Sequence, residues 1–123
     1  MHLEVVEFGF NLSGLQKEYL EKKITTLTRL LGRINPIDEE TLECKINLTR
    51  DETKSDLDRY LVRAVLYLPG RRTLEAEVRE ISPEVGIDRI KDKLEEQIRK
   101  LKTRLQEQGR WKKAGSEVIE ETE

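Results

Sequence analysis

Basic side chains recur at helical spacing in the second half of the chain. When successive residues are placed about 100° apart, five polar residues fall on one flank of an apolar stripe, and four of the five are basic. These residues are Arg89, Lys93, Gln97, Lys100 and Arg104. Each ammonium or guanidinium group that neutralises a phosphate releases a bound counterion, so such a row suits a polyphosphate backbone.

Two further sets of cations accompany this row. On the other flank of the same stripe lie Lys91, Arg99 and Lys102, with Asp88 and Glu95 among them. An earlier helix repeats the pattern with the row Lys22, Thr26, Arg29 and Arg33, and Lys23 lies beside its stripe. If the two helices pack side by side on a sheet, two basic ridges border one surface. Mixed-charge helices are also common on ordinary protein surfaces, and the charge pattern alone favours neither interpretation.

Residues suited to catalysis are few. His2 is the only histidine, which excludes metal sites with several histidine ligands and Ser-His-Asp arrangements. Cys44 falls on the inward face of an expected strand, so we expect a core residue rather than a nucleophile. The stretch LPGRR is a turn and not a phosphate-binding loop. We therefore expect no enzyme, no metal and no cofactor.

Aromatic residues give little support for base recognition. Tyr60 and Tyr67 fall on expected strands, where packing in the core or sheet is the favoured role. Trp111 lies between basic residues and could stack on a base, or could equally dock on the surface of the domain.

The elements that position these side chains follow from hydrophobic periodicity. We expect strands at 2–8, 41–50, 60–68 and 73–78, a turn at 69–72, and helices that begin at Ser13 and at Ser82–Pro83. Ser13 and Gln16 have the spacing of a capping box, and Ser82 is the expected N-cap of the last helix. The order β-α-β-β-β-α predicts an α+β fold, with an antiparallel meander and both helices on one face of a four-stranded sheet.

Composition and charge restrict the class of protein further. A chain of 123 residues suggests one domain, its single cysteine excludes an internal disulfide, and no apolar run reaches the length of a membrane span. We expect a cytoplasmic protein without a membrane partner. Residues 1–88 hold 13 basic and 17 acidic side chains, residues 89–113 hold ten and four, and residues 114–123 hold four glutamates and no base. This asymmetry places the expected polyanion contact on the last helix.

Three stretches resemble the ribosome hibernation-promoting factor and ribosome-associated inhibitor family. They are LSGLQKEYLEKKITTLTRLLGRI (12–34), LYLPGRRTLEAEV (66–78) and GIDRIKDKLEEQIRKLKTRL (86–105). The last is the most specific, and the resemblance covers about residues 1–108. It implies a fold similar to a double-stranded RNA-binding domain. It also implies a factor that binds 16S rRNA of the small ribosomal subunit, in the channel used by messenger and transfer RNA, and keeps ribosomes inactive under stress.

The resemblance also implies particular rRNA-binding residues. At matching positions these are Lys22, Lys23, Lys93, Arg99, Lys100 and Lys102, and the helical rows add Arg29, Arg33, Arg89 and Arg104. The sequence departs from the family pattern at ISPEV (81–85), where an acidic DMY segment is usual. It departs again at Glu96, where many relatives carry arginine.

We expect a ribosome-binding domain at 1–108 and a flexible, mostly acidic tail at 109–123, as in the short family form and without a dimerisation domain. We also expect a monomer away from the ribosome. Two alternatives remain open. The last helix or the acidic tail could serve as a protein-interaction module that binds no RNA, or the tail could fold back on the basic ridge and compete with RNA.

Overall fold

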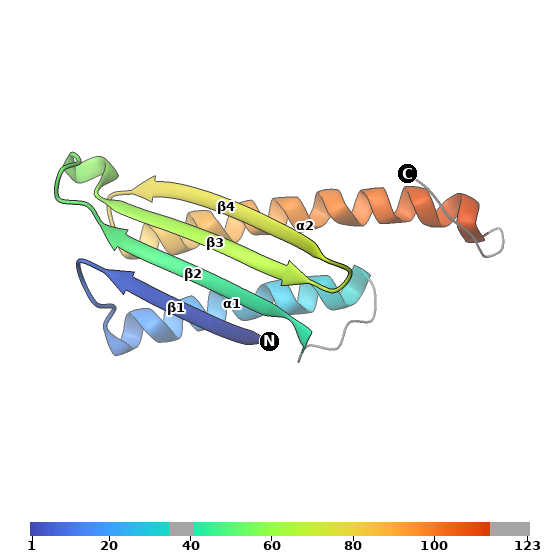
Figure 1. Ribbon diagram of the computed structural model, residues 1–123, viewed down its shortest axis with the longest axis horizontal. Helices are drawn as coiled ribbons and strands as arrows, with labels where there is room; N and C mark the ends of the chain where they lie inside the picture. The colour runs from blue at the N-terminus through green and yellow to red at the C-terminus, as the bar shows by residue number, and fades with distance from the viewer. Residues whose placement is uncertain (35–40, 114–123) are drawn as a thin grey trace.

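The structure, a computed structural model, describes residues 1–34 and 41–113, with the side chains of 33–34 and 106–113 left out. Its element order confirms the predicted β-α-β-β-β-α fold (Figure 1). The elements are β1 (His2–Phe8), α1 (Gly14–Ile34), β2 (Glu43–Arg50), the 3-10 turn η2 (Asp56–Asp58), β3 (Tyr60–Leu68), β4 (Arg72–Glu80) and α2 (Pro83–Lys113). The predicted boundary at residue 108 stays a prediction, and residues 114–123 lie outside the described part.

The four strands form one sheet in the order β1-β2-β3-β4. The predicted meander is confirmed, because β2 with β3 and β3 with β4 are antiparallel. Strand β1 pairs in parallel with β2, and α1 makes the crossover between them. Both helices lie behind the sheet in Figure 1, run in the same direction and cover a single face, as predicted. The other face is open.

The core lies between this covered face and the helices. The predicted inward faces of α1 and α2 are buried, with Ile24, Ile87, Ile90, Leu94 and Ile98 each 0% exposed. The alternating residues of β2 and β3 meet them from the sheet. Burial of these branched apolar side chains is the main stabilising contribution, at roughly 1.5–3 kcal/mol for each side chain.

Both helix starts carry the predicted caps. The Ser13 amide donates to Gln16 Oε1 (2.8 Å) and the Gln16 amide donates to Ser13 Oγ (3.1 Å), which completes the capping box. The Val85 amide donates to Ser82 Oγ (3.2 Å), so Ser82 caps α2 as expected. These caps fix where each helix begins, and therefore the phase of every charged residue along it.

The turn between β3 and β4 lies where it was predicted, and its backbone conformation explains its sequence. Leu68 pairs with Arg72, so the loop is Pro69-Gly70-Arg71, and both Gly70 (φ 81°) and Arg71 (φ 63°) adopt left-handed backbone. Glycine accepts this conformation at little cost, whereas arginine does so less readily. The short turn sets the register that places β4 at the sheet edge under α2.

Helix α2 lies close against β3 at Gly86. A Cβ atom built at this position would lie 2.6 Å from Val62 Cγ2, a methyl of a fully buried side chain. A side chain here would push the helix away from the sheet. Gly86 therefore sets the depth at which α2 rests on β3.

We predict that Gly86→Ala lowers the free energy of unfolding by about 1–3 kcal/mol through overpacking against Val62, despite the higher helix propensity of alanine. Gly32→Ala is the matched control, because no atom lies within 4 Å of its Cβ position. It should leave stability unchanged or raise it by up to about 1 kcal/mol. Chemical denaturation measures both, and a stable Gly86→Ala protein would show that the contact is not limiting.

Candidate nucleic-acid interface

One flank of α2 lies along β4, the edge strand of the sheet. Arg89 Nη1 forms an ion pair with Glu80 Oε2 (2.6 Å), and Gln97 Nε2 donates to the Glu75 carbonyl (2.6 Å). Lys93 Nζ donates to the Glu77 carbonyl at 3.4 Å. These contacts cover edge-strand carbonyls that could otherwise pair with another chain. The row predicted from periodicity exists, but its first three members bond to the protein itself.

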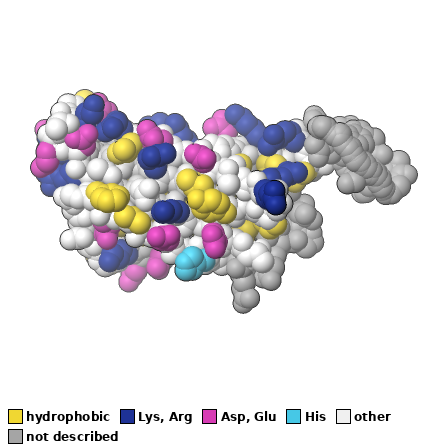
Figure 2. All heavy atoms as spheres, in the orientation of Figure 1, with side chains coloured by type: hydrophobic (Ala, Val, Ile, Leu, Met, Phe, Trp, Pro, Cys, Tyr) yellow, Lys and Arg dark blue, Asp and Glu magenta, His cyan; other side chains and the backbone are white. Residues whose placement is uncertain are grey.

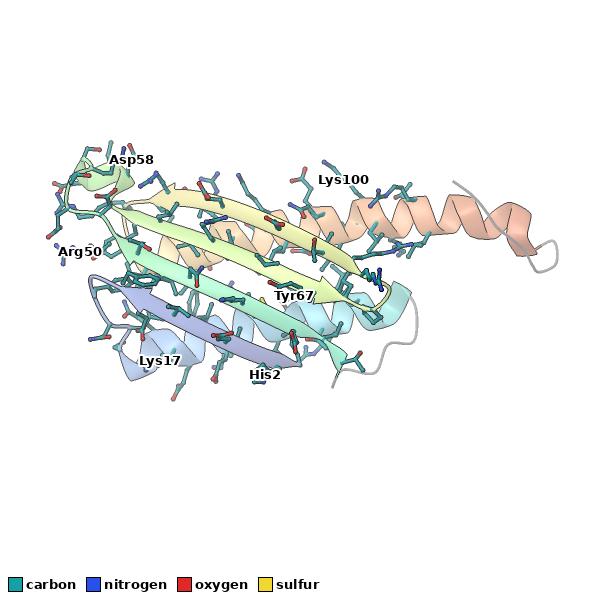
Figure 3. The ribbon with its side chains drawn as sticks, in the orientation of Figure 1. His2, Lys17, Arg50, Asp58, Tyr67 and Lys100 are labelled. Carbon is teal, nitrogen blue, oxygen red and sulfur yellow. The ribbon has the colours of Figure 1, made fainter. Side chains whose placement is uncertain are left out.

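The same flank continues beyond these contacts with two free cations. Lys100 and Arg104 are exposed and form no hydrogen bond or ion pair with any residue that the structure describes. Lys100 projects past the edge of β4 in Figure 3. Both line a shallow groove with Leu74, Gln97 and Thr103, which we call the α2–β4 groove. Here the predicted row offers unneutralised positive charge to a ligand.

The opposite flank of α2 faces α1 and is held there by polar contacts. The Tyr19 hydroxyl donates to Asp88 Oδ1, and Lys23 Nζ lies 3.5 Å from the same oxygen. Gln16 Nε2 donates to Glu84 Oε2 (2.7 Å). The negative charge of Asp88 raises the pKa of Lys23, and the hydrogen bond to Asp88 raises the pKa of Tyr19. Lys23, a predicted rRNA contact, thus links the two helices.

Glu95 forms ion pairs with two more cations on this flank of α2. Its carboxylate accepts from Lys91 Nζ (2.8 Å) and from Arg99 Nη2 (2.6 Å). The hydrogen bond from Lys91, followed by the positive charges of Lys91 and Arg99, lowers the pKa of Glu95 against the opposing effect of burial. Arg99, another predicted contact, is therefore partly neutralised. Lys102 lies on this flank half-buried, with no ion pair among the described residues.

Helix α1 presents its predicted row on the solvent side. Lys22 and Arg29 are exposed, have no ion pair within the described part of the chain, and line a second shallow hollow with Glu18, Glu21, Thr25 and Thr26. The side chain of Arg33 lies outside the described residues. The ridge on α1 and the free end of the ridge on α2 thus both reach the outer surface of the helix layer.

This outer surface carries acidic as well as basic side chains, so it is not formed by two uninterrupted basic ridges. Asp92 and Glu96 are exposed on the solvent side of α2, between the flank that follows β4 and the flank that faces α1. Of the ten predicted cations, Lys23, Arg89, Lys93 and Arg99 are held by internal contacts. Five others have no ion pair within the part of the chain that the structure describes: Lys22, Arg29, Lys100, Arg104 and the half-buried Lys102.

The open face of the sheet differs from the helix layer. Figure 2 shows apolar side chains among charges of both signs there. Phe8 is 53% exposed and Tyr67 is 40% exposed, so Tyr67 is a surface residue and not the packed residue expected from the sequence. Because side chains alternate along β3, Tyr67 points to the sheet face opposite that of Leu66 and Leu68. This alternation is visible in the sequence and identifies the face on which Tyr67 lies. Tyr60 does pack, edge to face with Phe10 at 5.1 Å between ring centroids.

Residues suited to catalysis do not assemble in the described part of the chain. No group of three or more His, Cys, Asp or Glu side chains there could hold a metal ion. Cys44 is buried as predicted, and burial raises the pKa of its thiol to about 12, which keeps it protonated and unreactive. Among the described helices, none is both long enough and apolar enough to cross a membrane.

Two helices on one face of a four-stranded sheet, with free cations on the helix side, define a small α+β binding domain. The family model for the sigma 54 modulation protein / S30EA ribosomal protein matches residues 4–106, and the chain belongs to this family. Family membership indicates a ribosome-associated modulation factor and no known class of enzyme, in agreement with the predicted hibernation family.

A solved structure confirms the fold. The N-terminal domain of Thermus thermophilus Protein Y superposes with a TM-score of 0.63 at 22% sequence identity, over 82% of this chain and 99% of that chain. A comparison with curated proteins gave no match.

We predict that Glu95→Gln destabilises the protein at neutral pH by about 1 kcal/mol or less, because two ion pairs within one helix are lost. A carboxylate whose pKa is lowered by folding stabilises the protein above its ordinary pKa of 4.5, and this stabilisation is lost as the pH falls through the lowered value. Melting temperatures should therefore differ at pH 7 and converge as the pH falls below the lowered pKa of Glu95.

Glu96→Gln is the matched control on the same helix, because Glu96 is exposed and has no ion pair among the described residues. It should match the parent protein at both pH values. A difference between the parent and Glu95→Gln that persists unchanged in acid would contradict the ion-pair explanation.

Proposed function

We propose that this protein binds the small ribosomal subunit at 16S rRNA in the channel for messenger and transfer RNA, and keeps ribosomes inactive under stress. It acts in the cytoplasm by occupying the channel, without catalysis or a cofactor. Membership of a ribosome-associated family supports the partner. The free cations on the outer surface of the helix layer support the mode of binding.

The observation that carries this proposal is the division of the cations into free and paired groups. Lys22, Arg29, Lys100 and Arg104 are exposed and unpaired within the described chain, so they can meet phosphates without breaking an internal contact. We assign them as the main rRNA contacts, with Lys102 and Arg33 beside them. Lys23, Arg89, Lys93 and Arg99 contribute mainly by holding the helices and the sheet edge in place.

The acids on α2 restrict how RNA can lie on this surface. A phosphate close to Asp92 or Glu96 would meet like charge, so the backbone must follow the two flanks and not the crest of α2. This arrangement recognises the shape of folded rRNA and the position of its phosphates, as expected for a domain that reads structured RNA without base-specific contacts.

Sedimentation with purified small subunits tests the proposal. We predict that the protein co-sediments at low salt and is released steeply as salt rises, because each neutralised phosphate releases a counterion. Lys100→Glu combined with Arg104→Glu should weaken binding on the order of tenfold or more and reduce the salt slope by about two. Absence of co-sedimentation at low salt would exclude the proposal.

Lys17→Glu combined with Lys45→Glu is the matched control, because it changes the net charge equally. Lys17 is exposed on the side of α1 toward β1, and Lys45 is exposed on the open face of the sheet. This control should bind as the parent protein does. Equal weakening of both double variants would show that net charge governs binding and that these helix positions do not.

Protein partners that remain bound after nuclease treatment would favour the protein-interaction alternative.

A further inference from the structure

The two edges of the sheet differ in how their backbone groups are used. At the β4 edge, the carbonyls of Glu75 and Glu77 accept hydrogen bonds from Gln97 and Lys93 of α2. The other edge is β1, and α1 lies behind the sheet there (Figure 1). The β4 edge is therefore partly closed by its helix, and the β1 edge needs a separate account of its backbone groups.

The backbone of β1 turns alternate residues outward. The His2 amide donates to the Leu42 carbonyl (2.8 Å), on the side of β2. Because successive residues of a strand direct their backbone groups to opposite sides, the even-numbered residues of β1 bond to β2. The odd-numbered residues Leu3, Val5 and Glu7 direct their amides and carbonyls outward. These outward groups have no hydrogen-bond partner among the described residues, so the edge can accept another strand.

The side chains along this edge are incompletely covered. Leu3 and Val5 contact the core but are half-buried. Their register partners on β2, Cys44 and Ile46, are 2% and 0% exposed. An additional strand with an apolar residue at alternate positions would cover Leu3 and Val5 from the outer side.

The charges of β1 select the kind of strand that fits. β1 contains two glutamates and lacks the lysine or proline that commonly protects an edge strand from pairing. Glu4 is exposed and has no ion pair among the described residues, and neither does Lys45, its register partner on β2. The carboxylate of Glu7 accepts from the Leu12 amide. An added strand therefore meets an unpaired carboxylate at Glu4, which favours a basic partner.

A second copy of this chain fits the edge less well. Two copies related by a two-fold axis pair their β1 strands antiparallel. Pairing centred on Val5 makes the two Glu4 side chains diagonal neighbours, and pairing centred on Glu4 places them directly opposite. Like charges at such positions destabilise a strand pair. A partner with basic residues meets no such repulsion.

We propose that the β1 edge binds an extended segment of a partner protein in which apolar and basic residues alternate, as an additional strand of the sheet. Hydrogen bonds to the outward groups of Leu3, Val5 and Glu7 supply the affinity, while the apolar residues cover Leu3 and Val5 and a basic residue meets Glu4. This contact goes beyond the proposed function, because it uses none of the cations that we assign to rRNA.

Titration of the full chain with the synthetic peptide KVKVKVK tests the proposal, with amide hydrogen exchange followed by NMR. Exchange at Leu3, Val5 and Glu7 should slow about tenfold at a peptide concentration of about nine times Kd, because these amides exchange only from the free fraction. The Val6 amide, which faces β2, should change little. Absence of protection at Leu3 and Val5 with millimolar peptide overturns the proposal.

The peptide EVEVEVE is the matched control for charge, because it keeps the apolar pattern and reverses every charged residue. It should bind about threefold or more weakly, since its acids meet Glu4. Equal binding of the two peptides would contradict a basic partner.

Glu4→Lys should weaken binding of KVKVKVK and strengthen binding of EVEVEVE, because Glu4 is exposed and its replacement leaves the core unchanged. Glu75→Lys makes the same change of charge at an exposed position of β4 and should leave both affinities unchanged. Equal effects of the two substitutions would mean that net charge governs the binding, and the β1 edge would not be the site.

Val5→Pro removes the central outward amide without removing a bond to β2, since proline is tolerated at an edge position that faces solvent. It should abolish the protection at Leu3 and Glu7. Protection that persists in folded Val5→Pro protein would refute strand addition, and the Glu4 and Glu75 variants decide the question if this variant does not fold.

A second copy at the edge would give a different result. Protection at Leu3 and Val5 would then rise with protein concentration in the absence of peptide, together with a dimer in sedimentation equilibrium, and this outcome would overturn the proposed partner. These experiments use no ribosomes, so their failure would leave the proposed function untouched.

Discussion

The burial of one apolar stripe of α2 against β3 and β4 determines the direction of every charge on that helix. Ile87, Ile90, Leu94 and Ile98 are fully buried, and Gly86 lets the helix rest directly on Val62. A helix fixed on one face cannot rotate to optimise its charges. The ion pairs of α2 are therefore consequences of core packing, and their individually small energies could not overcome it.

This constraint sorts the cations by their position along the helix. Near its start, the flanks of α2 meet neighbours: Asp88 faces α1, and Arg89 reaches Glu80 at the end of β4. Further along, α2 lies beside the first residues of β4. There the strand presents backbone carbonyls and Leu74 to the helix in place of carboxylates. Lys100 and Arg104 consequently have no acidic partner among the described residues, whereas Arg89 in the same row is paired with Glu80.

Much of the fold could be predicted because its signals are local. The capping box at Ser13 and Gln16, the cap at Ser82, the turn at Pro69–Arg71 and the buried faces of both helices each depend on residues a few positions apart. The parallel pairing of β1 was not predicted. Its residues Val5, Val6 and Glu7 are all half-buried, so the strand lacks the alternation that reveals a covered face.

The candidate site was predictable in outline but not in detail. Periodicity placed ten cations on the correct helices, yet it could not distinguish Arg89 from Arg104, because the partner of Arg89 lies on a strand whose path depends on the whole sheet. Glu95 was recognised as lying among cations, but the fact that it holds both Lys91 and Arg99 depends on side-chain geometry. Which charges are paired is a tertiary property.

A net charge of −2 is compatible with the proposed binding of a polyanion because several cations on the helices have no acidic partner among the described residues. Several acids of the described chain either hold bases in internal pairs or lie on the sheet side, as Glu77 does with Arg63 (3.1 Å). The cations that we assign to rRNA contact sit at fixed positions on two helices. A small, preorganised set of this kind gives an interaction that depends on salt and on the shape of the RNA more than on total charge.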